Sequence, residues 1–250
     1  MEPDSTTDDD LASAVARARN VLAGAARVVA LTGAGVSTAA GIPDYRGPDG
    51  VWTKNPAAER ASRSDVYAHD LEVRQRAWRV LLERTDHPPQ PTAAHYALVA
   101  AERAGRLIGV LTQNIDGLHR AAGTSPERLV ELHGTTARVR CLACATRYPT
   151  ANVVERVRAG DPDPRCERDL GDRICGGVLS ADIVRFGDPL DLRDRRRAAA
   201  FVDSADAMVV AGSTLTVYPA AGLVDEALAR GVPLVIVNAQ PTGYDALARA

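Results

Sequence analysis

A short apolar run at residues 27–31 leads directly into a glycine-rich turn, and this junction constrains the chain more than any other feature. Gly33 and Gly35 let the backbone bend sharply and approach a ligand with no side chain in between. The backbone N–H groups of the helical turn that follows carry partial positive charge and can donate to a phosphate. The junction therefore predicts a site for a dinucleotide.

The turn departs from the glycine fingerprint of hydride-transferring dehydrogenases. Thr38 stands at the third glycine of that pattern, and Trp52 and Lys54 lie where an acidic ribose anchor is expected. Residues 43–46, immediately behind the turn, bring Asp, Tyr and Arg side chains close to the expected phosphate site. That segment predicts a mobile flap over a cofactor, and a dehydrogenase becomes a remote alternative.

Composition narrows the class of protein. With 250 residues, 46% of them hydrophobic and 25% charged, the chain can bury a real core in one large domain or one and a half. A formal net charge of -2 gives no strong signal for nucleic acid. No apolar run approaches the roughly 20 residues that span a bilayer, and the acidic start does not resemble a secretory leader. We expect a cytoplasmic protein without a membrane partner.

All four cysteines fall in one short segment, at Cys141, Cys144, Cys166 and Cys175. The Cys-x-x-Cys pair places two thiolates on one turn, and the second pair can complete a tetrahedral sulfur site that suits zinc. Disulfides and free core cysteines are the alternatives. A reducing cytosol disfavours disulfides, and the polar flanking residues disfavour a core position. Four protein ligands leave no open position, so the one zinc ion predicted here is structural.

Apolar runs alternate with helix-like stretches, which predicts an α/β fold with a doubly wound parallel sheet, Rossmann-like, carrying a small zinc-binding module and a helical insertion. The expected strands are 27–31, 107–112, 207–211 and 233–238, and the expected helices include 10–22, 91–104 and 219–229.

The predicted organisation divides the chain into four parts. They are a disordered N-terminus at 1–9, a discontinuous cofactor-binding domain at 10–49, 90–140 and 176–250, the helical insertion and cofactor loop at 50–89, and the zinc-binding module at 141–175.

Three of the predicted strands end in polar residues, at the edge where an open α/β sheet binds its ligand. The segments concerned are 113–119, 212–214 and 238–240. An isolated Asn or Ser at a strand end is usually a helix cap. Three such ends with short hydroxyl and amide side chains favour recognition of ribose and phosphate.

These segments together resemble the sirtuins, a family of NAD-dependent protein deacylases. The matching motifs cover nearly the entire chain in the family's order: 33–37, 41–46, 112–119, 131–134, the four cysteines, 186–187, 212–214 with 219–221, and 238–240. Residues 47–52 and the wide spacing between Cys166 and Cys175 are most similar to the branch that includes chromatin-associated nuclear members.

The resemblance implies three catalytic residues: His133 as general base, and Asn114 and Asp116 holding the nicotinamide amide and its ribose. A neutral imidazole can accept a ribose proton near neutral pH. Gln113 would bond the ribose. The implied set of NAD-binding residues is Gly33, Ala34, Gly35, Ser37, Thr38, Asp44, Tyr45, Arg46, Trp52, Gln113, Asn114, Ile115, Asp116, Gly212, Ser213, Thr214, Asn238 and Gln240.

The resemblance also implies the reaction and the partner. An acyl group, expected to be acetyl, is removed from lysine of a protein or peptide, and nicotinamide and O-acyl-ADP-ribose are released. The peptide would add as a strand along Val184, Arg185, Phe186 and Gly187. Protein mono-ADP-ribosyl transfer and a non-catalytic NAD-sensing zinc module are the alternatives. His133 favours deacylation over the former, and retention of Asn114 and Asp116 counts against the latter.

Several positions depart from the family pattern. Ser213 and Thr214 stand in inverted order, and Asp188 replaces the commoner Glu at the peptide cleft. The short segment after residue 245 predicts a partly open adenine pocket. Members that remove acidic acyl groups carry a Tyr-x-x-Arg pair in the helical insertion, whereas Tyr67 is followed here by Asp70. The negative charge of Asp70, in place of that arginine, predicts a preference for neutral acyl groups.

Overall fold

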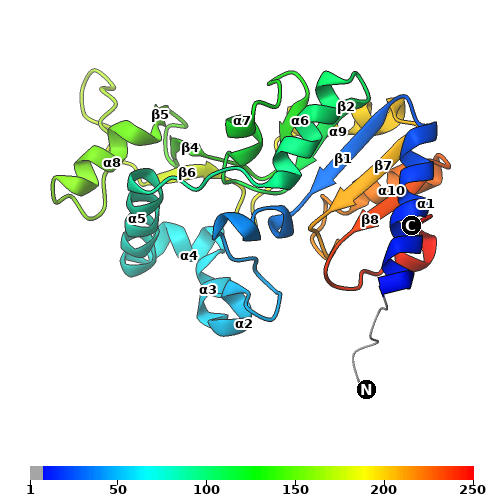
Figure 1. The fold of residues 1–250 in the computed structure, drawn as a ribbon. Coiled ribbons are helices and arrows are strands. Elements are labelled where there is room, and N and C mark those ends of the chain that lie inside the picture. Colours follow the sequence, from blue (N-terminus) through cyan, green and yellow to red (C-terminus); the bar gives the residue numbers. More distant parts are fainter. Residues whose placement is uncertain (1–7) are drawn as a thin grey trace.

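The computed structural model describes residues 8–250 and contains two sheets, which lie at opposite ends of the elongated view in Figure 1. The large sheet has five parallel strands in the order β3-β2-β1-β7-β8. The strands are β1 (Val28–Thr32), β2 (Leu107–Thr112), β3 (Leu129–Glu131), β7 (Ala207–Ala211) and β8 (Leu234–Val237). The doubly wound α/β prediction is confirmed.

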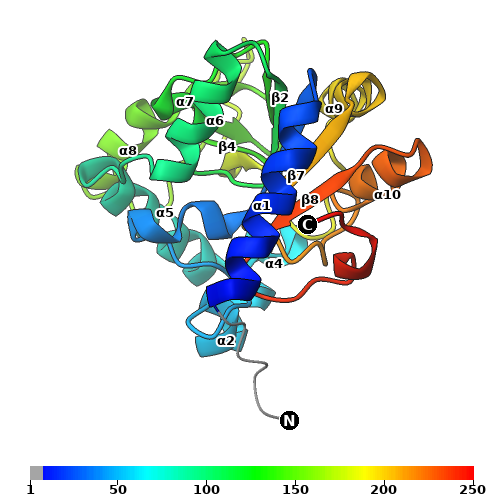
Figure 2. The ribbon, with the colours of Figure 1, turned by 45° about the vertical axis from the view of Figure 1, so that its right-hand side comes forward.

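Helices cover both faces of the large sheet, because its central strands are apolar on both sides. Val29 and Leu31 of β1 pack in the cluster that contains α9 and α10, while Ala30 packs in the cluster that contains α1 and α6. Figure 2 shows α1 crossing in front of the sheet, with α9 and α10 to one side. These helices are α1 (Asp8–Gly24), α6 (Ala93–Arg103), α9 (Leu192–Ser204) and α10 (Gly222–Ala229).

The small sheet is antiparallel, in the order β5-β4-β6, so the central strand β4 pairs with β5 on one side and with β6 on the other. Trp78 of α5 and Val154 of α8 pack on Val139 of β4 in one buried cluster. The elements of this region are β4 (Gly134–Cys141), β5 (Arg147–Pro149), β6 (Leu179–Ile183), α2 (Val51–Lys54), α3 (Pro56–Ala61), α4 (Ser64–His69), α5 (Leu71–Asp86) and α8 (Thr150–Arg158).

Differences from the predicted elements are concentrated at ends and in the small sheet. Strands 107–112 and 207–211 agree with β2 and β7, but β3 and all three strands of the small sheet were not predicted. The module predicted at 141–175 excludes β6 and nearly all of β4, which the antiparallel pairing holds in the same sheet.

The N-terminal helix begins at Asp8, two residues before its predicted start, so the disorder prediction is wrong for Asp8 and Asp9. The rest of that prediction, residues 1–7, lies outside the described residues. No helix within residues 8–250 is long and apolar enough to cross a bilayer.

Candidate active site

A cavity of about 720 Å³ lies at the carboxyl ends of β1, β2, β7 and β8, where the loops after these strands converge. This is the edge at which an open parallel sheet binds ligands. Most predicted site residues line it: Gly33, Ala34, Gly35, Thr38, Asp44, Tyr45, Arg46, Trp52, Gln113, Asn114, Ile115, His133, Val184, Arg185, Phe186, Gly187, Gly212, Ser213, Thr214, Asn238 and Gln240. Ser37 and Asp116 do not line this cavity.

The glycines of the first turn have a packing role that the sequence did not reveal. The Gly35 N–H donates to the carbonyl of Gly212 at 2.9 Å, so the loops after β1 and β7 touch backbone to backbone. A Cβ on Gly33 would stand 2.6 Å from the Gly212 oxygen, and one on Gly35 would stand 2.7 Å from its Cα. Only glycine permits this contact between the two loops.

The segment after β1 also differs from the predicted helical turn. It forms two 3₁₀ turns, Ala34–Val36 and Thr38–Ala40. The N–H of Ser37 donates to the Ala34 carbonyl, and that of Val36 to the Gly33 carbonyl. Several of the backbone donors expected to face a phosphate are therefore bonded within the protein.

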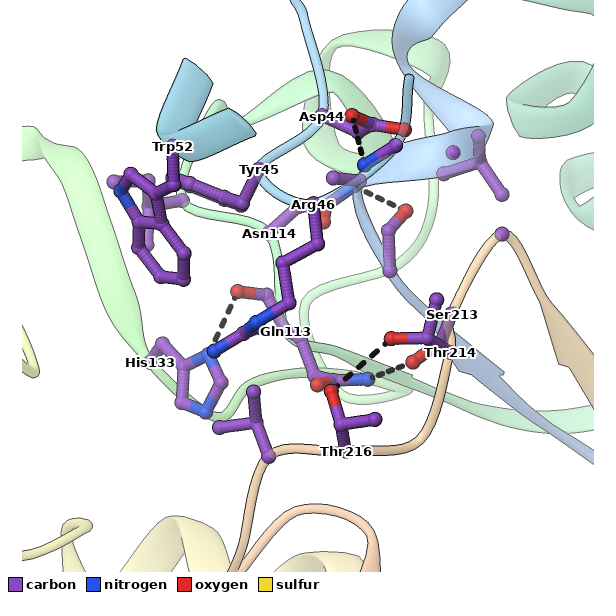
Figure 3. A pocket seen from close by; sticks show the side chains of 18 of the residues that line it. Asp44, Tyr45, Arg46, Trp52, Gln113, Asn114, His133, Ser213, Thr214 and Thr216 are labelled. Atoms are coloured by element: carbon purple, nitrogen blue, oxygen red, sulfur yellow. Dashed lines mark hydrogen bonds between the residues drawn. The ribbon is translucent and has the colours of Figure 1, made fainter. Parts of the chain in front are cut away.

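His133 lies in the connection between β3 of the large sheet and β4 of the small one. Its Nδ1 is 2.9 Å from the backbone oxygen of Gln113; since a carbonyl can only accept, Nδ1 carries the proton. Burial lowers the pKa of His133, and the bond to Gln113 only partly opposes that shift. The cavity is thus lined by a neutral imidazole whose Nε2 has a free lone pair (Figure 3).

Asn114, Ser37 and Asp116 form one hydrogen-bonded chain. The side-chain amide of Asn114 donates to the Gly33 carbonyl at 3.0 Å and to the Ser37 hydroxyl at 3.1 Å. The Ser37 hydroxyl donates to Asp116 at 2.8 Å, and the other carboxylate oxygen of Asp116 accepts the Leu118 N–H at 2.9 Å. Both N–H groups of the Asn114 amide are therefore used, which fixes its orientation at the cavity wall.

The Gln113 side chain bridges two loops across the cavity floor. Its amide donates to the Ser213 hydroxyl at 2.9 Å, and Thr214 and Thr216 share a hydroxyl contact at 3.2 Å (Figure 3). Ser213 is 8% exposed, whereas Thr214 is half-buried and its neighbour Thr216 is exposed. Of the two inverted hydroxyls, Ser213 is therefore committed to Gln113.

An aromatic cluster lies over one side of the cavity. The ring of Trp52 is 4.6 Å from that of Tyr45 and 5.5 Å from that of Phe186, and the Arg46 guanidinium stands 4.5 Å above Trp52. Asp44 holds the turn below by accepting the Gly47 N–H at 3.0 Å. The predicted flap thus joins the start of the helical insertion to the segment predicted to bind peptide.

Several backbone N–H groups of the predicted peptide-binding segment, residues 184–187, already donate hydrogen bonds within the protein. The Val184 N–H donates to the His133 carbonyl at 2.9 Å, and the Phe186 N–H donates to the Ser62 carbonyl at 3.1 Å. The Arg185 N–H donates to the Asp188 carboxylate at 3.2 Å. Within residues 8–250, the Val184 carbonyl and the Gly187 N–H have no such partner.

Sequence reasoning missed other residues of the cavity wall. One of them is Tyr218, an aromatic residue that is 63% exposed. Its hydroxyl lies 3.2 Å from Asp225 and 2.9 Å from the Tyr244 hydroxyl. An aromatic residue shortly after a polar strand end was the available signal. The further lining residues not named from the sequence are Val36, Ser62, Ala94, Ile183, Leu190, Ala211, Thr216, Val217, Val237 and Ala239, while Asp188 and the motif residues Gly47, Pro48 and Pro219 also line the cavity.

The four cysteines meet at one point of the small region. Their Sγ atoms all lie within 4.8 Å of one another, with 3.8 Å between Cys141 and Cys175 and 3.6 Å between Cys144 and Cys166. Zinc–sulfur bonds of about 2.3 Å in a tetrahedron place sulfurs about 3.8 Å apart, so this set fits one zinc ion. A Cβ on Gly177 would stand 2.7 Å from the Cys141 sulfur, so glycine is needed beside the site.

Comparison with protein-family models assigns the chain to a family. The model of the Sir2 family matches residues 33–219. The chain belongs to the Sir2 family. Among relatives in that family, NAD-dependent protein deacetylase 2 of Streptomyces coelicolor is 45% identical over 221 residues, covering 88% of this chain and 89% of the relative. NAD-dependent protein deacetylase 1 of Pyrobaculum aerophilum is 41% identical over 247 residues, covering 98% and 89%.

A solved Sir2 structure shares the fold over most of its length. It is a variant with a deacetylated p53 peptide and 3'-O-acetyl ADP ribose, and it superposes with a TM-score of 0.81 at 33% identity. The match covers 94% of this chain and 90% of that one. The Sir2-family resemblance of the motifs is thereby confirmed, while membership in the branch of nuclear members is not tested by these relatives.

Proposed function

We propose that this chain is an NAD-dependent protein-lysine deacetylase that releases nicotinamide and O-acetyl-ADP-ribose. The observation that carries the proposal is the neutral imidazole of His133 in the wall of a cavity built on Sir2 loops. Relatives named NAD-dependent protein deacetylase at 45% and 41% identity support the same activity.

The residues of the cavity fit NAD. Glycine loops, the Gln113 and Ser213 pair and the exposed Arg46 offer donors and a positive charge to a pyrophosphate and two riboses. When bound, NAD supplies an anomeric carbon with nicotinamide as leaving group, which the carbonyl oxygen of the acyl-lysine attacks. The aromatic cluster of Tyr45, Trp52 and Phe186 places apolar surface beside that region.

His133 serves as the general base. Its Nε2 accepts a proton from a ribose hydroxyl, and the Nδ1–H bond to the Gln113 carbonyl holds the ring and supports the positive charge that develops. The backbone oxygen of Gln113 holds the His133 ring, while the side-chain amide of Gln113, proposed to bind ribose, is itself held by the Ser213 hydroxyl. Gln113 therefore links the general base to the expected ribose site. The lowered pKa of His133 keeps it neutral and competent at ordinary pH.

Asn114 and Asp116 take different positions in this mechanism. Asn114 lines the cavity and presents its carbonyl oxygen to the ligand, since both of its N–H groups are bonded elsewhere. Asp116 acts through Ser37, whose hydroxyl it fixes at 2.8 Å. Asp116 and Ser37 are therefore proposed as positioning residues, not as the direct cofactor contacts that the resemblance implied.

The substrate peptide pairs with the free backbone groups at the cleft. Within the described residues, the Val184 carbonyl and both backbone groups of Gly187 are available to an added strand. The structural zinc ion would be held by the four cysteines, away from the cavity, where it folds the small region without entering the chemistry. Cysteine usage supports a cytoplasmic location, and the spacing of Cys166 and Cys175 supports the branch with nuclear members.

The proposal is tested by incubating the protein with NAD and an acetyl-lysine peptide and measuring the products by mass. Nicotinamide, deacetylated peptide and O-acetyl-ADP-ribose are expected in equal amounts, and omission of the peptide should abolish nicotinamide release. ADP-ribose attached to protein with the acetyl group retained would establish the transferase alternative. Binding of NAD with no turnover of any acyl peptide would establish the non-catalytic one.

A further inference from the structure

Arg185 places a positive charge in the wall of the cavity beside the peptide segment. It follows β6 by two residues, and its guanidinium carbon stands 3.7 Å above the ring of Tyr67. One guanidinium nitrogen donates to the Ser180 hydroxyl at 3.1 Å. The support beneath it is rigid, because Tyr67 is 1% exposed and donates its hydroxyl to the Leu179 carbonyl at 3.0 Å.

This guanidinium has no ion-pair partner within residues 8–250: no carboxylate oxygen of that part of the chain lies within 4.0 Å. The carboxylate of Asp188 is near, but it accepts the backbone N–H of Arg185 at 3.2 Å. Burial lowers the pKa of Arg185, while Tyr67 and Asp188 partly oppose the shift. An arginine remains charged under these conditions, so the cavity wall carries a half-buried cation whose guanidinium is ion-paired with no carboxylate of residues 8–250.

A more deeply buried arginine of this region, Arg74, shows how the fold pairs such a charge. Arg74 is 5% exposed and forms a two-pronged pair with Asp163, at 2.9 and 3.0 Å. A buried charge is costly unless it is paired, and Arg74 satisfies that rule within the chain. Arg185 is half-buried and has no such pair within residues 8–250, so its guanidinium is free to bind an anion that a ligand brings.

The positions of Tyr67 and Asp70 do not support the predicted preference for neutral acyl groups. Neither residue lines the cavity. The Asp70 carboxylate caps α5 by accepting the N–H groups of Glu72 and Val73, at 3.0 and 3.2 Å. The expected repulsion of an acidic acyl group by Asp70 therefore has no structural basis, and the charged residues that line the cavity at the peptide segment are Arg185 and Asp188.

We propose that Arg185 recognises a carboxylate carried by the substrate beside its acyl-lysine, and that it makes the enzyme select substrates with an acidic group there. The proposal rests on the proposed deacetylase function. A carboxylate is the anion that fits, because a guanidinium fork binds it through two parallel N–H bonds. An acidic side chain next to the modified lysine is one source, and an acyl chain ending in a carboxylate is the other.

The test compares matched peptides on the wild-type protein and on variants. One acetyl-lysine peptide carries Glu at successive positions within two residues of the lysine, its partner carries Gln there, and a third has neutral flanks and a succinyl-lysine. Both kcat/KM and the peptide Kd are measured, with NAD saturating. The variants are Arg185→Gln, Arg185→Lys and, as control, Arg147→Gln, which removes a charge from the same sheet outside the cavity.

For wild type and Arg147→Gln we expect at least one Glu peptide to exceed its Gln partner by about tenfold in kcat/KM, mostly through KM, which corresponds to one charge-assisted hydrogen bond. Arg185→Gln should abolish that ratio while still processing the Gln peptide, and Arg185→Lys should keep part of it. If the succinyl peptide alone shows the dependence on Arg185, the carboxylate comes from the acyl group.

Equal values for all matched peptides on wild type, or a preference that survives in Arg185→Gln, would overturn the proposal. Failure of the deacetylase function looks different, because then no peptide is turned over by any variant. In that case the Kd values still decide the role of Arg185, since tenfold tighter binding of the acidic peptide and its loss in Arg185→Gln need no turnover.

Discussion

The two sheets are stabilised in different ways. The large sheet is buried between aliphatic layers, with Val29, Leu31 and Val210 fully inaccessible and α9 and α10 packed on them. The small region has one cluster of eight buried residues, of which two are Cys141 and Cys166. So small an apolar cluster supplies little burial energy, and the cysteine site has to compensate for it.

The two regions also differ in their buried ion pairs. In the small region, Arg74 and Asp163 form an ion pair whose side chains are only 6% and 10% exposed, and three arginines surround Asp182. The large sheet has no comparable buried pair among the described residues. The large region therefore folds by apolar burial and carries the cofactor loops, while the small region depends on metal and charge.

Loss of the metal should produce the largest difference between the two regions. Because structural zinc sites contribute about 10–16 kcal/mol in zinc-finger peptides, Cys141→Ser should unfold the small region while the large sheet keeps its structure. Hydrogen exchange should show amides of β4 and β6 exposed and those of β1 still protected. Leu142→Ser, an exposed neighbour on the same turn, is the control and should retain metal.

Elemental analysis accompanies that experiment. One zinc ion per wild-type chain is expected. Folded, active wild-type protein without zinc would contradict the assigned role of the cysteines.

A smaller effect should come from breaking the buried ion pair. Asp163→Asn leaves Arg74 without its partner in the interior, which costs about 3–5 kcal/mol for a buried pair. The control is Asp161→Asn, whose partner Arg156 is 27% exposed, and its cost should stay below about 1 kcal/mol. Urea unfolding followed by far-UV circular dichroism measures both. Equal losses would show that burial of the pair does not matter.

The smallest effect concerns pH and the large region. Burial, with the neighbouring His95 ring adding to it, lowers the pKa of His119 to about 3, while its ordinary value is 6.5. Between these values the unfolded chain binds the proton and the folded chain does not, so stability falls as pH drops from 6.5 toward 3. His119→Gln should reduce that slope by at most about 1.4 kcal/mol per pH unit.

The unfolding free energy at pH 6.5 and at pH 4.5 gives this slope, with His87→Gln as the control for the exchange itself. A slope unchanged by His119→Gln would remove the buried imidazole from the acid sensitivity of the large region.

Much of the large sheet could be predicted, because its strands are continuous apolar runs with polar residues at their carboxyl ends. β2 and β7 were predicted with their observed bounds. β3 was missed, since Leu129–Glu131 is too short to form a periodic signal. The small sheet was missed because β4 carries two arginines, β5 has only three residues, and the pairing of β4 with β6 joins segments far apart in the sequence.

The site was predictable as a set of residues but not as a geometry. The family resemblance implied that Asp116 holds the nicotinamide amide or its ribose, yet its carboxylate turns to Ser37 and Leu118. Gly33 and Gly35 were correctly placed at the cavity, but the close contact with Gly212 that requires them depends on a loop far along the chain. Side-chain direction and loop-to-loop contact are tertiary properties that local patterns do not contain.

We expect the chemistry to occur where the two regions join, at His133 between β3 and β4. The most direct measurement is the kcat of His133→Ala on an acetyl-lysine peptide, together with its Kd for NAD, with the exposed His69→Ala as control. We predict a loss on the order of a hundredfold or more in kcat for His133→Ala, an NAD affinity close to that of wild type, and no loss for His69→Ala. Undiminished turnover by His133→Ala would contradict the account.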